Sequence, residues 1–138
     1  MPTINLHHVV YCVRAENQDR AAAFWADLGL TFVEVPLPEE GIRVLLDWDA
    51  GIEIVAPGEP EGTETERFRD FLAEQGEGVY SVVVRADEVD GPVSVATGHG
   101  ATTRYRQHRE HGDVFVDEVD LAPVFGMSVT LLATNRPD

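Results

Sequence analysis

The chain has 138 residues, of which 43% are hydrophobic, so it is long and apolar enough to fold as one ordinary domain around a buried core. Its net charge of −15 excludes nucleic acid and anionic membranes as expected partners, because an acidic surface repels both. No apolar run has the length of a membrane span, the first residues lack the pattern of a signal peptide, and the one cysteine, Cys12, permits no internal disulfide. These features predict a cytoplasmic protein.

The first half of the sequence predicts a strand, a helix and three further strands. The β-branched run NLHHVVYCVRA at residues 5–15 predicts the first strand, and residues 16–30 carry apolar side chains at helical spacing. Short apolar runs bounded by glycine and proline predict the next three strands, at residues 31–38, 41–48 and 51–57.

The second half repeats this order after a linker. Residues 58–77 are polar and glycine-rich at their ends, and apolar residues at helical spacing in their middle predict a short helix. The run GVYSVVVRA at 78–86 predicts a new strand, and a weaker helical pattern follows at 87–100. The last three strands are predicted at residues 101–109, 112–120 and 126–134.

Aligning the two halves tests whether this repeat is regular. Placing LHHVVYCVRA over VYSVVVRADE sets His8 over Ser81, and placing GIEIVAP over SVTLLAT sets Glu53 over Thr130. The two pairs span similar lengths of chain, so the halves are nearly equal. A repeat of this size is typical of a pseudo-twofold architecture, in which each half lends strands to one shared structure.

The sequence resembles the vicinal oxygen chelate superfamily, which includes glyoxalase I, methylmalonyl-CoA epimerase, extradiol dioxygenases and bleomycin-resistance proteins. The segments LHHVVYCV, AAAFWADLGLTFV, IEIVAP and FGMSVTLLAT carry the resemblance. It implies an α+β, glyoxalase-like fold in which two βαβββ modules form a cupped, mostly antiparallel sheet pair. We therefore expect a single domain over residues 1–138, with module one at 4–57, a linker helix at 58–77 and module two at 78–134.

The resemblance also implies four metal-ligand positions, with His in the first strand, Glu or Gln in the fourth, His in the fifth and Glu in the eighth. In this sequence they fall on His8, Glu53, Ser81 and Thr130, so two match and two do not. Zn, Fe, Mn, Co and Ni prefer imidazole and carboxylate to neutral hydroxyls, so we expect an incomplete or absent divalent metal site. If a metal is bound, His8 and Glu53 are its expected ligands. The sequence has no glycine-rich phosphate loop, so we expect no nucleotide cofactor.

His8 and Glu53 are the candidate catalytic residues. A buried imidazole beside a carboxylate can transfer protons to and from a substrate next to a carbonyl. The alternative is that the two residues remain from a former metal site and only line a binding pocket. Neighbours on a strand point to opposite faces, and the resemblance implies that His8 points into the cup, whereas His7 falls on the other face or near the end of the strand.

The candidate substrate-binding residues are of three kinds. The first are the hydroxyls of Ser81 and Thr130. Trp48 and Tyr105 are aromatics on or near strands, and an aromatic wall favours an apolar or ring-containing ligand. Arg104 opens the cationic stretch RYRQHREHGD, which could bind an anionic substrate group or could form a solvated hairpin rich in local ion pairs.

These residues predict a lyase or isomerase that acts on a small organic carbonyl or ring compound. An extradiol dioxygenase is disfavoured, because Ser81 stands where its second histidine would be. The alternative is a non-catalytic small-molecule binding protein like the bleomycin-resistance branch, so the sequence leaves open whether the chain is an enzyme. The resemblance further implies a homodimer.

Overall fold

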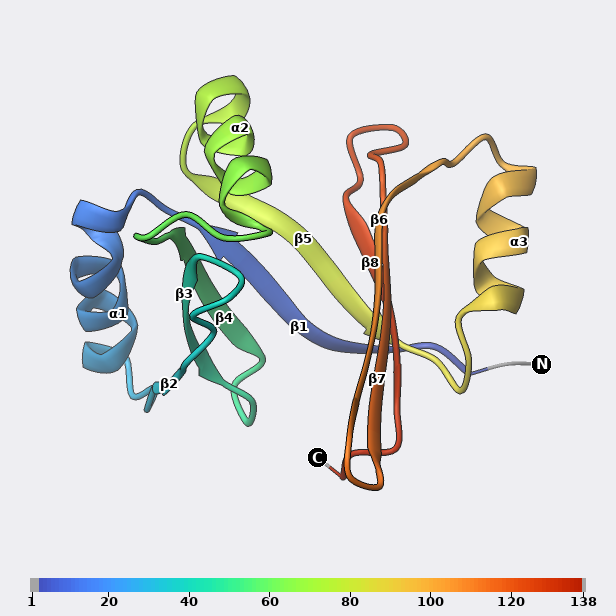
Figure 1. Ribbon diagram of the computed structural model, residues 1–138, viewed down its shortest axis with the longest axis horizontal. Coiled ribbons are helices and arrows are strands. Elements are labelled where there is room, and N and C mark those ends of the chain that lie inside the picture. The colour runs from blue at the N-terminus through green and yellow to red at the C-terminus, as the bar shows by residue number, and fades with distance from the viewer. Residues whose placement is uncertain (1–2, 138) are drawn as a thin grey trace. The chain divides into compact units, whose positions relative to one another are not determined.

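The computed structural model describes residues 3–137, whose contacts divide the chain into two units. The first unit is His8–Tyr80, and the second unit joins the described residues of 1–7 to those of 81–138. Each unit contains a four-stranded sheet of the same strand arrangement (Figure 1). Over residues 3–137, no helix is both long enough and apolar enough to cross a membrane.

The first unit is built on a mixed sheet with strand order β2-β3-β4-β1. The β2–β3 and β3–β4 pairs are antiparallel, and β1 is parallel to β4. Its elements are β1 (Asn5–Cys12, in the unit from His8 on), the 3-10 helix η1 (Ala15–Asn17), α1 (Gln18–Asp27), β2 (Val33–Val35), β3 (Ile42–Asp47), β4 (Ile52–Pro57) and α2 (Thr65–Gln75).

The second unit has the equivalent strand order β5-β8-β7-β6. Here β6–β7 and β7–β8 are antiparallel, and β5 is parallel to β8. Its elements are β5 (Gly78–Arg85, in the unit from Ser81 on), α3 (Asp90–Gly98), β6 (Thr103–His111), β7 (Val114–Leu121) and β8 (Val129–Thr134). Both halves therefore follow the order βαβββ, and the predicted α+β class with two such modules is confirmed.

Strand β4 is the centre of the first unit. Ile54, Val55 and Ala56 are all fully buried, so both faces of this strand are covered, and both α1 and α2 contact it. Such a strand has a continuous apolar run rather than alternating polarity, which is what IEIVAP shows.

A buried glutamine joins α1 to this sheet. Gln18 is 1% exposed, and its Nε2 donates hydrogen bonds to the carbonyl oxygens of Arg43 (2.8 Å) and Ile54 (3.1 Å). The helix is thus held by polar contacts as well as by packing. Phe24 and Leu28, two apolar residues of the helical pattern, are 62% and 63% exposed, so this pattern predicts the helix correctly but not all of its buried face.

The core of the second unit lies between α3 and its sheet. Val89, Val119, Leu131 and Ala133 are at most 4% exposed, and Val93 and Ala96 of α3 belong to the partly buried residues that pack on this cluster. Strand β6, at the edge, carries the sequence TRYRQHREH, whose side chains are mostly exposed. Charged side chains on an edge strand discourage pairing with another chain.

Two glycines allow the loop before α2 to cross the start of β3. A Cβ on Gly41, whose φ is +66°, would lie 2.1 Å from the backbone nitrogen of Gly62. The Thr65 hydroxyl fastens the crossing, because it accepts from the Gly62 N–H (2.8 Å) and donates to the Gly41 carbonyl (2.7 Å). Side chains cannot replace hydrogen at these two positions unless the backbone moves.

We predict that Gly41→Ala lowers the free energy of unfolding by about 3 kcal/mol, because it combines a backbone clash with a strained positive φ. Gly98→Ala is the control. Gly98 lies in α3 with nothing within 4 Å of its added Cβ, so this change should be neutral or stabilise by up to about 1 kcal/mol. Urea denaturation measures both, and equal stabilities would contradict the packing described here.

Cys12 is fully buried on the same face of β1 as His8 and Val10. Burial raises the pKa of its thiol to about 12, so the reactive thiolate is suppressed at neutral pH. We predict no labelling of the native protein by iodoacetamide at pH 8 and complete labelling of this one thiol in urea, measured by intact-protein mass spectrometry. Rapid labelling under native conditions would show that the thiol is accessible.

Candidate functional site

The two units hold their candidate residues in the same register. In the first unit, Val10 pairs with Glu53 across the parallel strands β1 and β4, and His8 lies two residues before Val10. In the second unit, Val83 pairs with Thr130 across β5 and β8, and Ser81 lies two residues before Val83. The strand pairings of the two units therefore agree with the alignment of the two sequence halves at these positions.

His8 and Glu53 form a close pair in the first unit. Burial alternates along β1, so His8 is 5% exposed while His7 is only half-buried. His8 Nε2 lies 3.4 Å from Glu53 Oε1, and the Glu53 side chain is 18% exposed. The imidazole is therefore enclosed, and the carboxylate beside it is the more accessible member.

Trp48 also contacts His8. The two rings meet edge to face, with centroids 4.7 Å apart, while Trp48 itself is 40% exposed. Trp48 follows β3, where the Asp47 carboxylate accepts hydrogen bonds from the backbone N–H groups of Thr31 (2.9 Å) and Ala50 (3.1 Å). These bonds lower the pKa of Asp47 and fix the turn that carries the indole.

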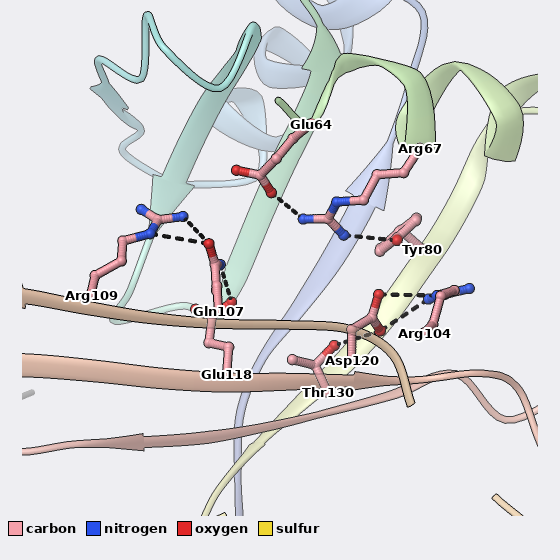
Figure 2. A network of polar contacts seen from close by, with 9 residues as sticks. All are labelled: Glu64, Arg67, Tyr80, Arg104, Gln107, Arg109, Glu118, Asp120 and Thr130. Carbon is pink, nitrogen blue, oxygen red and sulfur yellow. Dashed lines mark hydrogen bonds and ion pairs between the residues drawn. The ribbon is translucent and has the colours of Figure 1, made fainter. Parts of the chain in front are cut away.

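In the second unit, Ser81 and Thr130 contact each other and a buried carboxylate. Their hydroxyl oxygens are 2.7 Å apart, and Thr130 Oγ1 donates to Asp120 Oδ1 at 3.1 Å. Arg104 donates from Nε and Nη2 to the two Asp120 oxygens, each at 3.0 Å, as Figure 2 shows. Ser81, Thr130 and Asp120 are all buried.

A register shift in β6 lets Arg104 reach Asp120. Thr103 pairs with Leu121 and Tyr105 with Asp120, so Arg104 is the extra residue of a β-bulge. A bulge changes the direction in which a side chain points. Tyr105, a predicted substrate-binding residue, lies directly opposite Asp120 in this ladder.

The other arginines of the cationic stretch have carboxylate or amide partners within their own unit. Arg106 lies 3.1 Å from Asp90 and 3.5 Å from Asp117. Arg109 donates to the side-chain oxygen of Gln107, as Figure 2 also shows. The hairpin therefore forms the local ion pairs that one of the two interpretations expects.

Sequence reasoning missed two polar groups. Asp120 interrupts the buried run Val119–Leu121, and a charged residue between two buried apolar neighbours is the signal that could have identified it. The second group joins Glu64, Arg67 and Tyr80 of the first unit. Arg67 contacts Glu64 and donates to the Tyr80 hydroxyl at 2.9 Å. Tyr80 is buried against Phe68 and is a core aromatic.

The residues present do not fit the four-ligand metal centre that the resemblance implies. Among residues 3–137, no group of three or more His, Cys, Asp or Glu side chains is placed to hold one ion. The first unit offers two donors, whereas Zn and related ions generally need three or more protein ligands. The equivalent hydroxyls of the second unit are hydrogen-bonded to each other, as described above.

Comparison with known proteins gives matches in structure alone. No protein-family model matches the chain, and no curated protein sequence does. A hypothetical protein from Bacillus halodurans superposes with a TM-score of 0.74 at 16% identity, over 99% of this chain and 98% of that one.

Methylmalonyl-CoA epimerases are also among the similar structures. A variant of the Streptomyces coelicolor enzyme, in complex with 2-nitronate-propionyl-CoA, has a TM-score of 0.69 at 18% identity over 97% of this chain and 96% of that one. The Mycobacterium tuberculosis enzyme has a TM-score of 0.66 at 23% identity, over 93% and 86%. At these identities the likeness shows the fold alone, and the chain has the glyoxalase-like fold of these neighbours.

Proposed function

We propose that this protein is an isomerase or lyase that moves a proton next to the carbonyl group of a small organic compound, with Glu53 as the proton carrier and His8 as its positioning residue. The contact between these two side chains carries the proposal. An imidazole and a carboxylate buried together are costly to desolvate, and such a pair is more easily understood where it has a task.

The unequal exposure of the pair assigns the two roles. The Glu53 side chain is 18% exposed and can meet a ligand, whereas His8 is 5% exposed and is enclosed by Glu53 and Trp48. His8 would orient the carboxylate and compensate its charge when protonated. Trp48, which is 40% exposed and contacts His8, offers an apolar ring on which a substrate could pack.

The chemistry follows from a carboxylate near an acidic C–H bond. Glu53 accepts the proton from the carbon next to the carbonyl, the C–H electron pair forms the C=C bond of an enolate, and the carbonyl π pair moves to oxygen. Delivery of the proton to a different carbon of an extended enolate, or to the opposite face of the original carbon, completes an isomerisation, whereas return to the face it left regenerates the substrate. Departure of a leaving group from the adjacent carbon, with re-formation of the carbonyl, completes an elimination.

The structural neighbours support a carbonyl substrate without fixing which one. One epimerase structure holds methylmalonyl-CoA and others hold 2-nitronate-propionyl-CoA, so this fold accommodates thioester ligands in those proteins. For this chain we propose only the class, a small organic carbonyl or ring compound. The expected homodimer and cytoplasmic location are part of the same proposal, and light scattering after size-exclusion chromatography tests the dimer.

A binding protein without catalysis is the second candidate. The accessible Glu53 carboxylate and the partly exposed Trp48, which both contact His8, favour an apolar ligand that carries positive charge in a chain of net charge −15. Such a protein would bind its ligand and release it unchanged.

Proton exchange in D₂O distinguishes the two candidates. We predict that the protein exchanges the hydrogen next to the carbonyl in one of three probes, methylmalonyl-CoA, acetoin or 2-methylcyclohexanone, followed by ¹H NMR. Glu53→Gln should slow the exchange by at least about 100-fold, because a positioned base contributes that much. Glu74→Gln, an exposed carboxylate on α2, should leave the rate unchanged.

Exchange at the wild-type rate in Glu53→Gln would remove the proposed role of Glu53. Binding of a probe in calorimetry without exchange would contradict the enzyme and favour the binding protein.

A further inference from the structure

The second unit contains a network of polar side chains, buried except at Arg104, that joins its four strands. It runs from Ser81 on β5 through Thr130 on β8 and Asp120 on β7 to Arg104 on β6. The last three members are drawn in Figure 2. We propose that this polar network has taken the place of metal ligation in the second unit. The protein would then fold and keep its candidate site without a divalent ion.

The position of this polar network in the fold supports the inference. Ser81 occupies in the second unit the position that His8 occupies in the first, two residues before the paired residue of its strand. Thr130 occupies the position of Glu53, in the strand pairing itself. The first unit places an imidazole and a carboxylate there, and the second places two hydroxyls. Neutral hydroxyls are poor ligands for Zn, Co and Ni, but they can donate and accept hydrogen bonds.

The hydrogen bonds leave little for an ion to bind. Thr130 donates its proton to Asp120, so Ser81 must be the donor in the contact between the two hydroxyls. Both Asp120 oxygens accept from the Arg104 guanidinium. A dication at this carboxylate would have to displace that pair and would then lie beside the positive charge of Arg104.

Asp120 marks the change between the units. It pairs with Thr130 across β7 and β8, and the equivalent pair in the first unit is Leu46 with Glu53 across β3 and β4. The apolar Leu46 gives Glu53 no polar contact from that strand position. In the second unit a carboxylate at the same position, balanced by Arg104, is the acceptor for the Thr130 hydroxyl, which in turn accepts from Ser81.

Metal content and thermal stability test the inference, and they do so whether the chain is an enzyme or a binding protein. We expect protein expressed without a His-tag and purified without chelator to carry less than about 0.1 Zn, Fe, Mn, Co or Ni per chain by mass spectrometry. Its Tm should not change with EDTA, and Zn²⁺ or Ni²⁺ should not raise it.

The variants test the structural half of the inference. Asp120→Asn, which keeps the shape and removes the charge, should lower Tm by about 5 °C or more. Thr130→Val interrupts the polar network by a smaller change and should lower Tm less. This variant tests the inference if Asp120→Asn does not fold. Asp87→Asn, an exposed acid of the same unit with the same loss of charge, should have no effect.

Three results would overturn the proposal. The first is about one ion per chain that EDTA removes with a fall in Tm. The second is a rise in Tm with Zn²⁺ in the wild type that Thr130→Val abolishes. The third is a Tm for both Asp120→Asn and Thr130→Val that equals that of Asp87→Asn.

Discussion

Parallel pairing of the first and last strand in each βαβββ unit is the constraint on which the candidate site depends. A parallel pair needs a long connection, which the helix and the two intervening strands supply, and it sets side chains from distant parts of the sequence next to each other. In the first unit this pairing brings His8 within 3.4 Å of Glu53. In the second it brings Ser81 within 2.7 Å of Thr130. The backbone geometry is thus repeated, and the chemistry that it carries is not.

The difference between the units follows from how each one satisfies buried polar groups. A lone buried carboxylate is unfavourable, so Asp120 is stable where Arg104 and Thr130 surround it with donors. Glu53 has fewer such contacts and keeps part of its surface exposed, which leaves it available to a ligand. The polar groups of the second unit are therefore hydrogen-bonded to one another, whereas the first unit keeps a partly exposed acid–base group. That asymmetry favours a function centred on the first unit.

The sequence predicted the order of elements because β-branched runs and glycine or proline breaks are local signals. Alternation along the first strand predicted that only one of His7 and His8 lies on the inner face, and the family resemblance, not the alternation, selected His8. The sequence did not predict the partners of Arg104, because the bulge that lets this side chain reach Asp120 leaves no local pattern. The loop crossing at Gly41 and Gly62 was missed for the same reason: two segments distant in sequence meet only in the folded chain.

The contact between the His8 imidazole and the Glu53 carboxylate is the central claim of this account, and ¹⁵N NMR of the histidine rings measures it most directly. Assigned ring-nitrogen shifts of His8 should change in Glu53→Gln and stay constant in Glu74→Gln, because only the first removes a charge 3.4 Å from Nε2. The shifts of the exposed His99 should be the same in all three proteins. His8 shifts that do not respond to Glu53→Gln would show that the two side chains are not in contact, and the proposed proton transfer would lose its basis.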